Sequence, residues 1–189
     1  LFDGRSIIAW PDGTAVVAPS WTEGILVADL LSPDACEWLG DGEITILSPD
    51  EDLISSDDDL LDAVIIGLSD YCRKSGISKI VLGLSGGIDS ALAACVASAA
   101  VGAENVTGIS MPSRHSSQHS IDDAKATAEA LGINFSIQPI SDLHLSAELA
   151  LKETLANGNP VAAENLQARL RGLIVMAHAN ANGAMAIAT

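Results

Sequence analysis

The chain has 189 residues, 48% of them hydrophobic, which suffices for one domain of ordinary size with its own core and an appendage. Its 9 Lys and Arg stand against 25 Asp and Glu, and the formal net charge of -16 disfavours binding to the phosphate backbone of a nucleic acid. No apolar run approaches a membrane span, no signal segment stands at the start, and Cys36, Cys72 and Cys95 are odd in number and widely spaced, so we expect a cytoplasmic protein with reduced thiols.

The first 30 residues are predicted to form β structure. Residues 6–10 and 14–18 flank Pro11-Asp12-Gly13, which is typical of a hairpin turn. Residues 24–30 supply a third strand by the same pattern.

An acidic linker is predicted next, over residues 31–58. This range carries Ser, Pro, Asp and Glu in excess, most densely at residues 55–59. A calcium site is the alternative, but the spacing of an EF-hand loop, with its Gly and closing Glu, is missing. Cys36 would follow the last strand, and a lone cysteine is more often inert than catalytic.

The remaining residues alternate between helical and strand patterns, which predicts an α/β fold. The pattern predicts helices over residues 59–76, 91–100, 120–131, 141–157 and 163–177, and strands over residues 80–84, 106–110, 133–140 and 183–189. The first of these helices would be capped by Asp59.

The turn after the strand at residues 80–84 has the features of an anion-binding loop. Ser85, Gly86 and Gly87 allow a sharp turn and leave no side chain to obstruct an oxyanion. The helix behind them would point its unpaired N–H groups at the glycines, and the Ser90 hydroxyl adds a donor. Asp89 is either a simple acid at a helix start or, beside a phosphate, a Mg²⁺ ligand. Plain chain reversal is the competing interpretation of Gly-Gly at this place.

Residues 111–117 form a second candidate, the ligand loop, at the carboxyl end of the next strand. This segment holds a proline among hydroxyl and basic residues, which is typical of a binding loop in that position. His115 and His119 are four residues apart and could form a zinc pair on a helix, but Pro112 and the serines argue against a continuous helix there.

Arg169 and Arg171 form a third candidate. They are two residues apart and so do not share one helix face, and one of them can be an ordinary salt-bridge or snorkelling residue. In a chain with so few cations, however, a pair ahead of an apolar run favours an anionic ligand.

The sequence Gly-Leu-Ser-Gly-Gly-Ile-Asp-Ser at residues 83–90 resembles the Ser-Gly-Gly-x-Asp-Ser pyrophosphate loop of the ATP-pyrophosphatase enzymes. Members of that family adenylate a carbonyl or carboxylate oxygen, release pyrophosphate, and let a nitrogen or sulfur nucleophile displace AMP. The loop alone does not separate NAD synthetase from GMP synthetase, asparagine synthetase, argininosuccinate synthetase or the tRNA thiolation enzymes. It lacks the Gly-Lys-Ser/Thr of a Walker loop.

Three further motifs resemble the glutamine-dependent NAD synthetases. Residues 111–117 resemble their Met-Pro-Ser-Arg-Tyr-Ser-Ser, with His115 in place of Tyr. Residues 164–171 resemble their Glu-Asn-x-Gln-Ala-Arg-x-Arg, and the final Ala-Thr resembles the pair that precedes their Gly-Asn-Lys-Ser-Glu. Residues 2–6, Phe-Asp-Gly-Arg-Ser, together with Gly13, resemble the closing strands of a nitrilase-type amidase domain.

The resemblance implies a set of site residues. ATP would be bound by Gly83, Leu84, Ser85, Gly86, Gly87, Ile88, Asp89, Ser90, Met111 and Thr189. Ser85 and Asp89 would be catalytic, and Asp89 would also hold Mg²⁺. Asn165, Arg169 and Arg171 would contact the dinucleotide substrate, deamido-NAD.

It also implies an architecture: an open, mainly parallel sheet with helices on both faces, like the adenine nucleotide alpha hydrolases, preceded by a short β segment. Residues 1–30 would close a nitrilase-like glutaminase domain, residues 31–58 would be the acidic linker, and residues 59–189 would be an NAD synthetase domain truncated at its C-terminus. We expect a fragment of a longer polypeptide, because the sequence lacks an initiator Met and ends where the last strand ends.

The activity implied is ATP- and Mg²⁺-dependent amidation of deamido-NAD to NAD through an adenylated carboxylate. Ammonia would come from glutamine hydrolysed in the upstream domain, and the enzyme would be a homo-oligomer that binds neither nucleic acid nor membrane. Two alternatives remain: another enzyme of the same loop family, such as GMP synthetase, or an inactive nucleotide-binding fragment.

Overall fold

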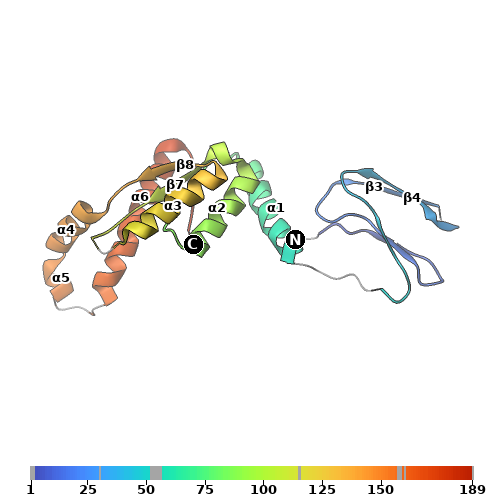
Figure 1. Cartoon of the computed structure of the whole chain (residues 1–189), viewed down its shortest axis with the longest axis horizontal. Coiled ribbons are helices and arrows are strands. Elements are labelled where there is room, and N and C mark those ends of the chain that lie inside the picture. Colours follow the sequence, from blue (N-terminus) through green and yellow to red (C-terminus); the bar gives the residue numbers. More distant parts are fainter. Residues whose placement is uncertain are drawn as a thin grey trace. The chain divides into compact units, whose positions relative to one another are not determined.

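The computed structural model describes residues 3–29, 31–51, 57–114, 116–156, 159 and 161–188. It contains two compact units, Leu1–Gly67 and Leu68–Thr189 (Figure 1).

The first unit is built mainly from short antiparallel strands. The strands are β1 (Ile7–Ala9), β2 (Ala15–Val17), β3 (Gly24–Asp29), β4 (Ser32–Gly40) and β5 (Thr45–Leu47). They form one sheet in the order β1-β2-β5 and a separate β3-β4 pair. The predicted hairpin is confirmed, since Ile8 lies opposite Val16 across the antiparallel β1–β2 pair.

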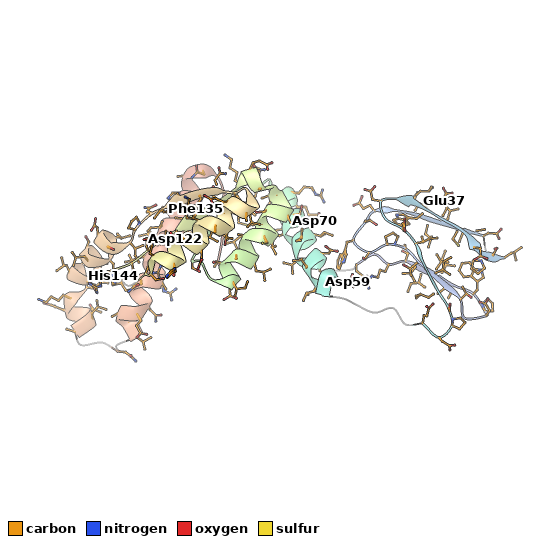
Figure 2. All side chains as sticks on the ribbon, viewed as in Figure 1. Glu37, Asp59, Asp70, Asp122, Phe135 and His144 are labelled. Carbon is orange, nitrogen blue, oxygen red and sulfur yellow. The ribbon has the colours of Figure 1, made fainter. Side chains whose placement is uncertain are left out.

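The prediction that residues 31–58 are a linker is wrong for much of that range, because β4 and β5 lie within it. Cys36 is in β4 opposite Ala28 and does not follow the last strand. In β4, Cys36 and Trp38 are half-buried whereas Glu37 is exposed (Figure 2). A strand with one solvated face accommodates acidic side chains there, so an acidic composition does not exclude pairing. Residues 52–56, in the acidic run, lie outside the described residues.

The second unit contains a four-stranded parallel sheet. Its strands are β6 (Ile80–Gly83), β7 (Val106–Ser110), β8 (Asn134–Ile137) and β9 (Met185–Ile187), in the order β8-β7-β6-β9. Leu82, in the middle of β6, lies beside Gly108 of β7 and Ile187 of β9. The predicted open, mainly parallel sheet is therefore confirmed.

Helices connect these strands. They are α1 (Asp57–Ser75), α2 (Ile88–Val101), α3 (Gln118–Leu131), α4 (Ser141–Ala150), α5 (Lys152–Ala156) and α6 (Val161–Asn182), with a short 3₁₀ turn, η1 (Ala103–Asn105), before β7. The single helix predicted over residues 141–157 is two helices, since Leu151 leaves helical geometry between α4 and α5. Within the described ranges, none of these helices has the length and apolar character that crossing a bilayer requires.

The centre of the sheet, at β6 and β7, is buried on both faces, as the unbroken apolar run of β6 requires. Ile80 and Leu82 pack on the side of α2 and α3, in a cluster with Ala94 and Ala128. Val81 points the other way and packs with residues of α6. Figure 1 shows α2 and α3 side by side along the sheet.

The strand order creates a point where the chain reverses its direction across the sheet. From β6 the chain moves outward to β7 and β8, and α6 then carries it back to β9 on the opposite side of β6. In open α/β sheets, ligands bind outside the carboxyl ends of the strands at such a point. The candidate site is therefore expected just beyond β6 and β9.

Candidate functional site

The chain turns from β6 into α2 through a loop that needs glycine at one position. Gly86 has a φ of +83°, and an added Cβ there would lie 2.4 Å from the carbonyl oxygen of Ser120. Gly87 is the N-cap of α2 and offers no side-chain acceptor to the first-turn N–H groups. The loop thus packs against the start of α3 and leaves these N–H groups without a side-chain cap, as an anion-binding helix start requires.

The two predicted serines of this phosphate loop (residues 83–90) are placed differently. Ser90 is 2% exposed, and its Oγ donates to the Gly87 carbonyl oxygen at 2.9 Å and accepts from the Ser85 N–H at 3.2 Å. The two Oγ atoms are 3.0 Å apart. Ser85 is exposed, and its Oγ accepts from the Gly87 N–H at 3.2 Å. Ser90 therefore holds the loop in shape from within, and Ser85 is the exposed member of the pair.

A cavity of about 620 Å³ lies beyond the carboxyl ends of β6, β7 and β9. That volume is in the range of small-molecule sites. The cavity is lined by Gly83, Leu84, Ser85, Ile109, Ser110, Met111, Pro112, Ser116, Ser120, Ile121, Ala168, Arg171, Gly172, Val175, Met176, Ala186, Ile187 and Ala188. It joins the start of the phosphate loop, the ligand loop and α6, which are far apart in the sequence.

Arg171 is the one ionisable residue among these cavity-lining residues. It is half-buried, and its Nε donates to the carbonyl oxygen of Met111 at 3.3 Å. Met111 is 9% exposed and packs against the start of the phosphate loop, since a Cβ on Gly83 would lie 2.9 Å from its Cε. The structure thus brings Gly83, Ser85, Met111 and Arg171 to one cavity.

The other predicted substrate residues stand apart from the cavity lining. Asn165 and Arg169 are exposed on α6, and neither lines the cavity. The cavity-lining residues of α6 form a stripe along one side of the helix. Asn165 precedes Ala168 by three positions, so it continues that stripe toward the start of α6. Arg169 lies at the side of that stripe, and Arg171 lies within it.

Asp89 is exposed in the first turn of α2 and does not line the cavity. Mg²⁺ is commonly held by one or two protein carboxylates together with substrate phosphates and waters, and a single exposed carboxylate beside the phosphate loop fits that donor set. In the part of the chain that is described, no three His, Cys, Asp or Glu side chains gather closely enough to hold a metal by themselves. His119 is exposed on α3. Thr189, His115 and Phe2, which the sequence motifs include, lie outside the described residues.

Several cavity-lining residues were not predicted from sequence. Ser110 ends β7, Ser120 lies near the start of α3, and Gly172 and Met176 lie on α6. Ser116, by contrast, belongs to the predicted ligand loop. Ser110 could have been found from its place at a strand's carboxyl end. The α6 residues follow from Arg171 by helical spacing, but only once the cavity-facing side of the helix is known.

A family model described as NAD synthase matches residues 60–189. The glutamine-dependent NAD(+) synthetase of Rhodobacter capsulatus is 44% identical over 191 residues, covering 100% of this chain and 34% of that protein. The chain thus spans about a third of the length of the curated relatives it matches. Both findings confirm the resemblance that the sequence motifs indicated.

Two solved structures agree with these findings. The glutamine-dependent NAD+ synthetase of Acinetobacter baumannii in complex with ADP aligns with a TM-score of 0.67 and 30% identity, over 80% of this chain and 31% of that one. The NMN synthetase of Francisella tularensis aligns with a TM-score of 0.61 and 30% identity, over 70% of this chain and 54% of its own.

Proposed function

The chain belongs to the NAD synthase family, and from this premise we propose that the protein forms NAD by ATP-dependent amidation of deamido-NAD. The observation that carries this proposal is the cavity of about 620 Å³, where the phosphate loop and Arg171 meet. Relatives that match the whole chain are named glutamine-dependent NAD(+) synthetases, and one compared structure holds ADP.

ATP lies with its phosphates at the start of α2. The backbone N–H groups of the phosphate loop and the Ser85 hydroxyl hold the β- and γ-phosphates, and the positive end of the α2 dipole adds to the attraction. Ser90 acts behind them, since its buried hydroxyl fixes the positions of Ser85 and Gly87. The apolar part of the cavity, including Met111 and Ile187, accommodates the rest of the nucleotide.

The reaction proceeds in two displacements. A carboxylate oxygen of deamido-NAD attacks the α-phosphorus of ATP, and pyrophosphate leaves with the bonding electrons to give an acyl adenylate. The amides of the phosphate loop stabilise the charge on the departing pyrophosphate. Ammonia then attacks the acyl carbon and loses a proton, and AMP departs to leave the amide of NAD. No covalent enzyme intermediate is needed, so positioning and electrostatics supply the rate.

Asp89 is the residue that would hold Mg²⁺ here. When bound, this ion offsets the negative charge that collects on the phosphate oxygens. Asp89 contributes an exposed carboxylate at the edge of the phosphate loop, close to where those oxygens lie.

Deamido-NAD enters along α6. Arg171, the one charged residue among the described residues that line the cavity, faces its anionic groups. Asn165 extends the cavity-facing stripe of α6 toward the solvent, and Arg169 lies beside it, so both contact the more exposed part of the dinucleotide. Thr189 is proposed as an ATP contact from the sequence motif alone.

The ammonia comes from glutamine hydrolysed by a nitrilase-like domain. We assign residues 1–30 to the closing strands of that domain and residues 59–189 to the NAD synthetase domain. The enzyme works in the cytoplasm as a homo-oligomer. The free thiols of Cys36, Cys72 and Cys95 support a reducing compartment.

The test is an assay of the full-length protein with ATP, Mg²⁺, ammonium and deamido-NAD. We expect NAD, AMP and pyrophosphate in equal amounts, and Ser85→Ala should lower kcat by about tenfold or more because it removes a donor to the reacting phosphates. Ser98→Ala, a serine change on the far end of α2, is the matched control. Release of ADP and inorganic phosphate, or failure to form NAD, would rule the proposal out.

The mononucleotide counterpart of deamido-NAD is a second candidate acceptor. This acceptor is favoured by the alignment of an NMN synthetase with this chain at 30% identity and a TM-score of 0.61. Competition between the two acceptors in the same assay, read as the ratio of kcat/KM values, decides between them.

A further inference from the structure

Separate elements hold successive residues of the ligand loop. The carbonyl oxygen of Met111 accepts from Arg171 of α6 at 3.3 Å. The carbonyl oxygen of Pro112 accepts from the N–H of Ile140, just before α4, at 2.9 Å. Arg114 pairs with the carboxylate of Glu148 of α4. The ligand loop is thus fastened to α6 and to the start and body of α4.

Arg114 forms an ion pair with Glu148, at 3.1 Å between Nη2 and Oε1. His144, one turn earlier on α4 (Figure 2), is 4% exposed, and its Nε2 lies 3.7 Å from the same Glu148 oxygen. That distance is too long for a hydrogen bond, and the Nε2 finds no hydrogen-bond partner among the described residues. The buried ring of His144 and the guanidinium of Arg114 therefore approach the same oxygen of Glu148. Because the Glu148 side chain is 29% exposed and that of Arg114 56%, Glu148 is the more buried member of the pair.

The ligand loop in turn lies against the phosphate loop. Met111 packs on Gly83, and Pro112 and Ser116 line the cavity with Ser85. A displacement of Arg114 would therefore move the wall of the cavity that faces the nucleotide.

We propose that Glu148 is a positioning residue for the site: by holding Arg114, it fixes the ligand loop against the phosphate loop and so sets the affinity for the adenine nucleotide. This inference rests on the proposed function, because it takes an adenine nucleotide as the occupant of the cavity. Glu148 itself does not line the cavity and touches no substrate.

The experiment measures ADP affinity of the full-length protein by calorimetry. Glu148→Gln keeps the size of the side chain and removes its charge, and we expect it to weaken ADP binding by about two- to fivefold, as a partly exposed ion pair allows. Glu129→Gln is the matched control: it also removes one carboxylate from an ion pair, that with Lys125 at 3.5 Å, on an exposed face of α3. It should leave ADP affinity unchanged.

A second comparison separates positioning through Arg114 from a purely structural role of Glu148. If Glu148 acts through Arg114, then adding Glu148→Gln to Arg114→Gln weakens ADP binding no further than Arg114→Gln alone. Matching unfolding midpoints show that the variants are folded. Wild-type affinity in Glu148→Gln, or an equal loss in both backgrounds, overturns the inference. A wild-type protein that binds ADP and forms no NAD overturns the proposed function alone.

Discussion

Gly86 is the residue whose replacement the site tolerates least. Alanine there would be strained by the φ of +83°, and its Cβ would lie 2.4 Å from backbone of α3. Gly132 is the matched control, with a φ of +69° and no atom within 4 Å of an added Cβ. We expect Gly132→Ala to lower the free energy of unfolding by about 1 kcal/mol, from backbone strain alone. Gly86→Ala should lower it further and also abolish ADP binding, as measured by urea unfolding and calorimetry. Equal losses of stability in both variants would contradict the steric argument.

Ser90 tests the internal support of the phosphate loop. Its buried hydroxyl has polar contacts with Ser85 and Gly87, so Ser90→Ala leaves those groups without their partner. We expect a loss of about 1–3 kcal/mol in the free energy of unfolding together with weaker ADP binding. In Ser98→Ala, the hydroxyl removed bonds only the carbonyl oxygen of Ala94 one turn earlier in α2, and both quantities should change little. Identical behaviour of the two variants would show that the loop does not depend on Ser90.

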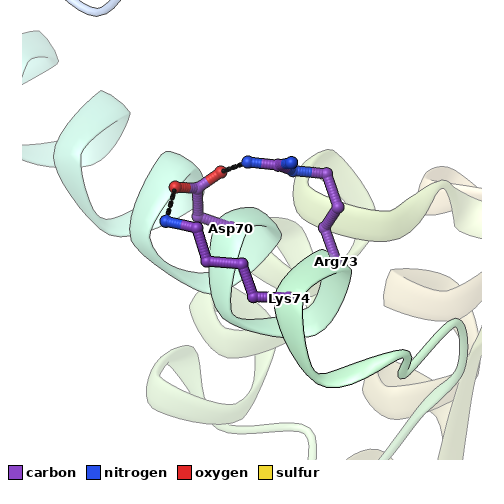
Figure 3. Close-up of polar contacts among 3 residues, drawn as sticks. All are labelled: Asp70, Arg73 and Lys74. Atoms are coloured by element: carbon purple, nitrogen blue, oxygen red, sulfur yellow. Dashed lines mark hydrogen bonds and ion pairs between the residues drawn. The ribbon is translucent and has the colours of Figure 1, made fainter.

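Asp70 on α1 provides a test of surface electrostatics (Figure 3). Its carboxylate accepts from Lys74 Nζ at 2.7 Å and from Arg73 Nη2 at 2.8 Å. These two hydrogen bonds lower the pKa of Asp70 from 3.8 to about 2, and the one with Lys74 has the larger effect. A depressed folded-state pKa means that the pair's stabilisation is present above pH 3.8 and is lost as the pH falls through about 2.

The effect on unfolding should be small for so exposed a pair, so the direct measurement is an NMR titration of the Asp70 carboxyl carbon. Lys74→Gln should raise the pKa of Asp70 toward 3.8. Lys125→Gln, which removes an exposed lysine from α3, should leave the pKa of Asp70 unchanged. A pKa near 3.8 for Asp70 in the wild-type protein would contradict the two hydrogen bonds to its carboxylate.

Among the elements, α6 determines what the cavity can hold. Its residues Ala168, Arg171, Gly172, Val175 and Met176 form one stripe along the cavity. Gly172 lies in the middle of the helix, and an added Cβ would have no atom within 4 Å. A glycine in the middle of a helix is destabilising. At Gly172 the missing side chain leaves room for a ligand in the cavity.

The prediction is that two substitutions at Gly172 separate stability from binding. Gly172→Ala should raise the free energy of unfolding by about 0.5–1 kcal/mol and keep ADP binding. Gly172→Leu should also preserve the helix, but its side chain would occupy the cavity and weaken ADP binding. Thermal unfolding and calorimetry give both quantities. If the leucine variant binds ADP as well as the alanine variant does, the ligand does not lie against this part of α6.

The strand–loop–helix unit of β6 and α2 could be predicted from sequence because local chemistry decides it: an apolar run, two glycines and an alanine-rich helix. The burial of Ser90 could not, since it depends on how Ser85 folds back over it. Arg169 and Arg171 are chemically equivalent in the sequence, and only the orientation of α6 places one of them in the cavity. The strand β4 was missed because its charged residues, Asp34 and Glu37, concealed a pattern that pairing with β3 satisfies. The strand β5 was missed because it is only three residues long and pairs with the distant β2.

At the scale of the whole molecule, the alternation of strands and helices predicts the fold class but not the order of the strands. The β6–β7–β8 succession follows from short right-handed crossovers. The position of β9 depends on the long return through α4, α5 and α6, which places the end of the last strand beside the phosphate loop. The site is thus a product of topology, and its parts come from residues 83 to 188.

All of the cavity-lining residues therefore belong to the second compact unit, Leu68–Thr189. We predict that removal of residues 1–50 from the 189-residue chain leaves ADP affinity within about twofold of that of the intact chain, since distant groups act additively. Calorimetry measures the affinity, and far-UV circular dichroism should show the helices retained. Gly86→Ala in the shortened chain is the control, and it should abolish binding just as it does in the intact chain. Loss of ADP affinity on shortening, with the helices intact, would mean that the β unit contributes to the nucleotide site. In that case the cavity beyond β6 and β9 would be only part of it.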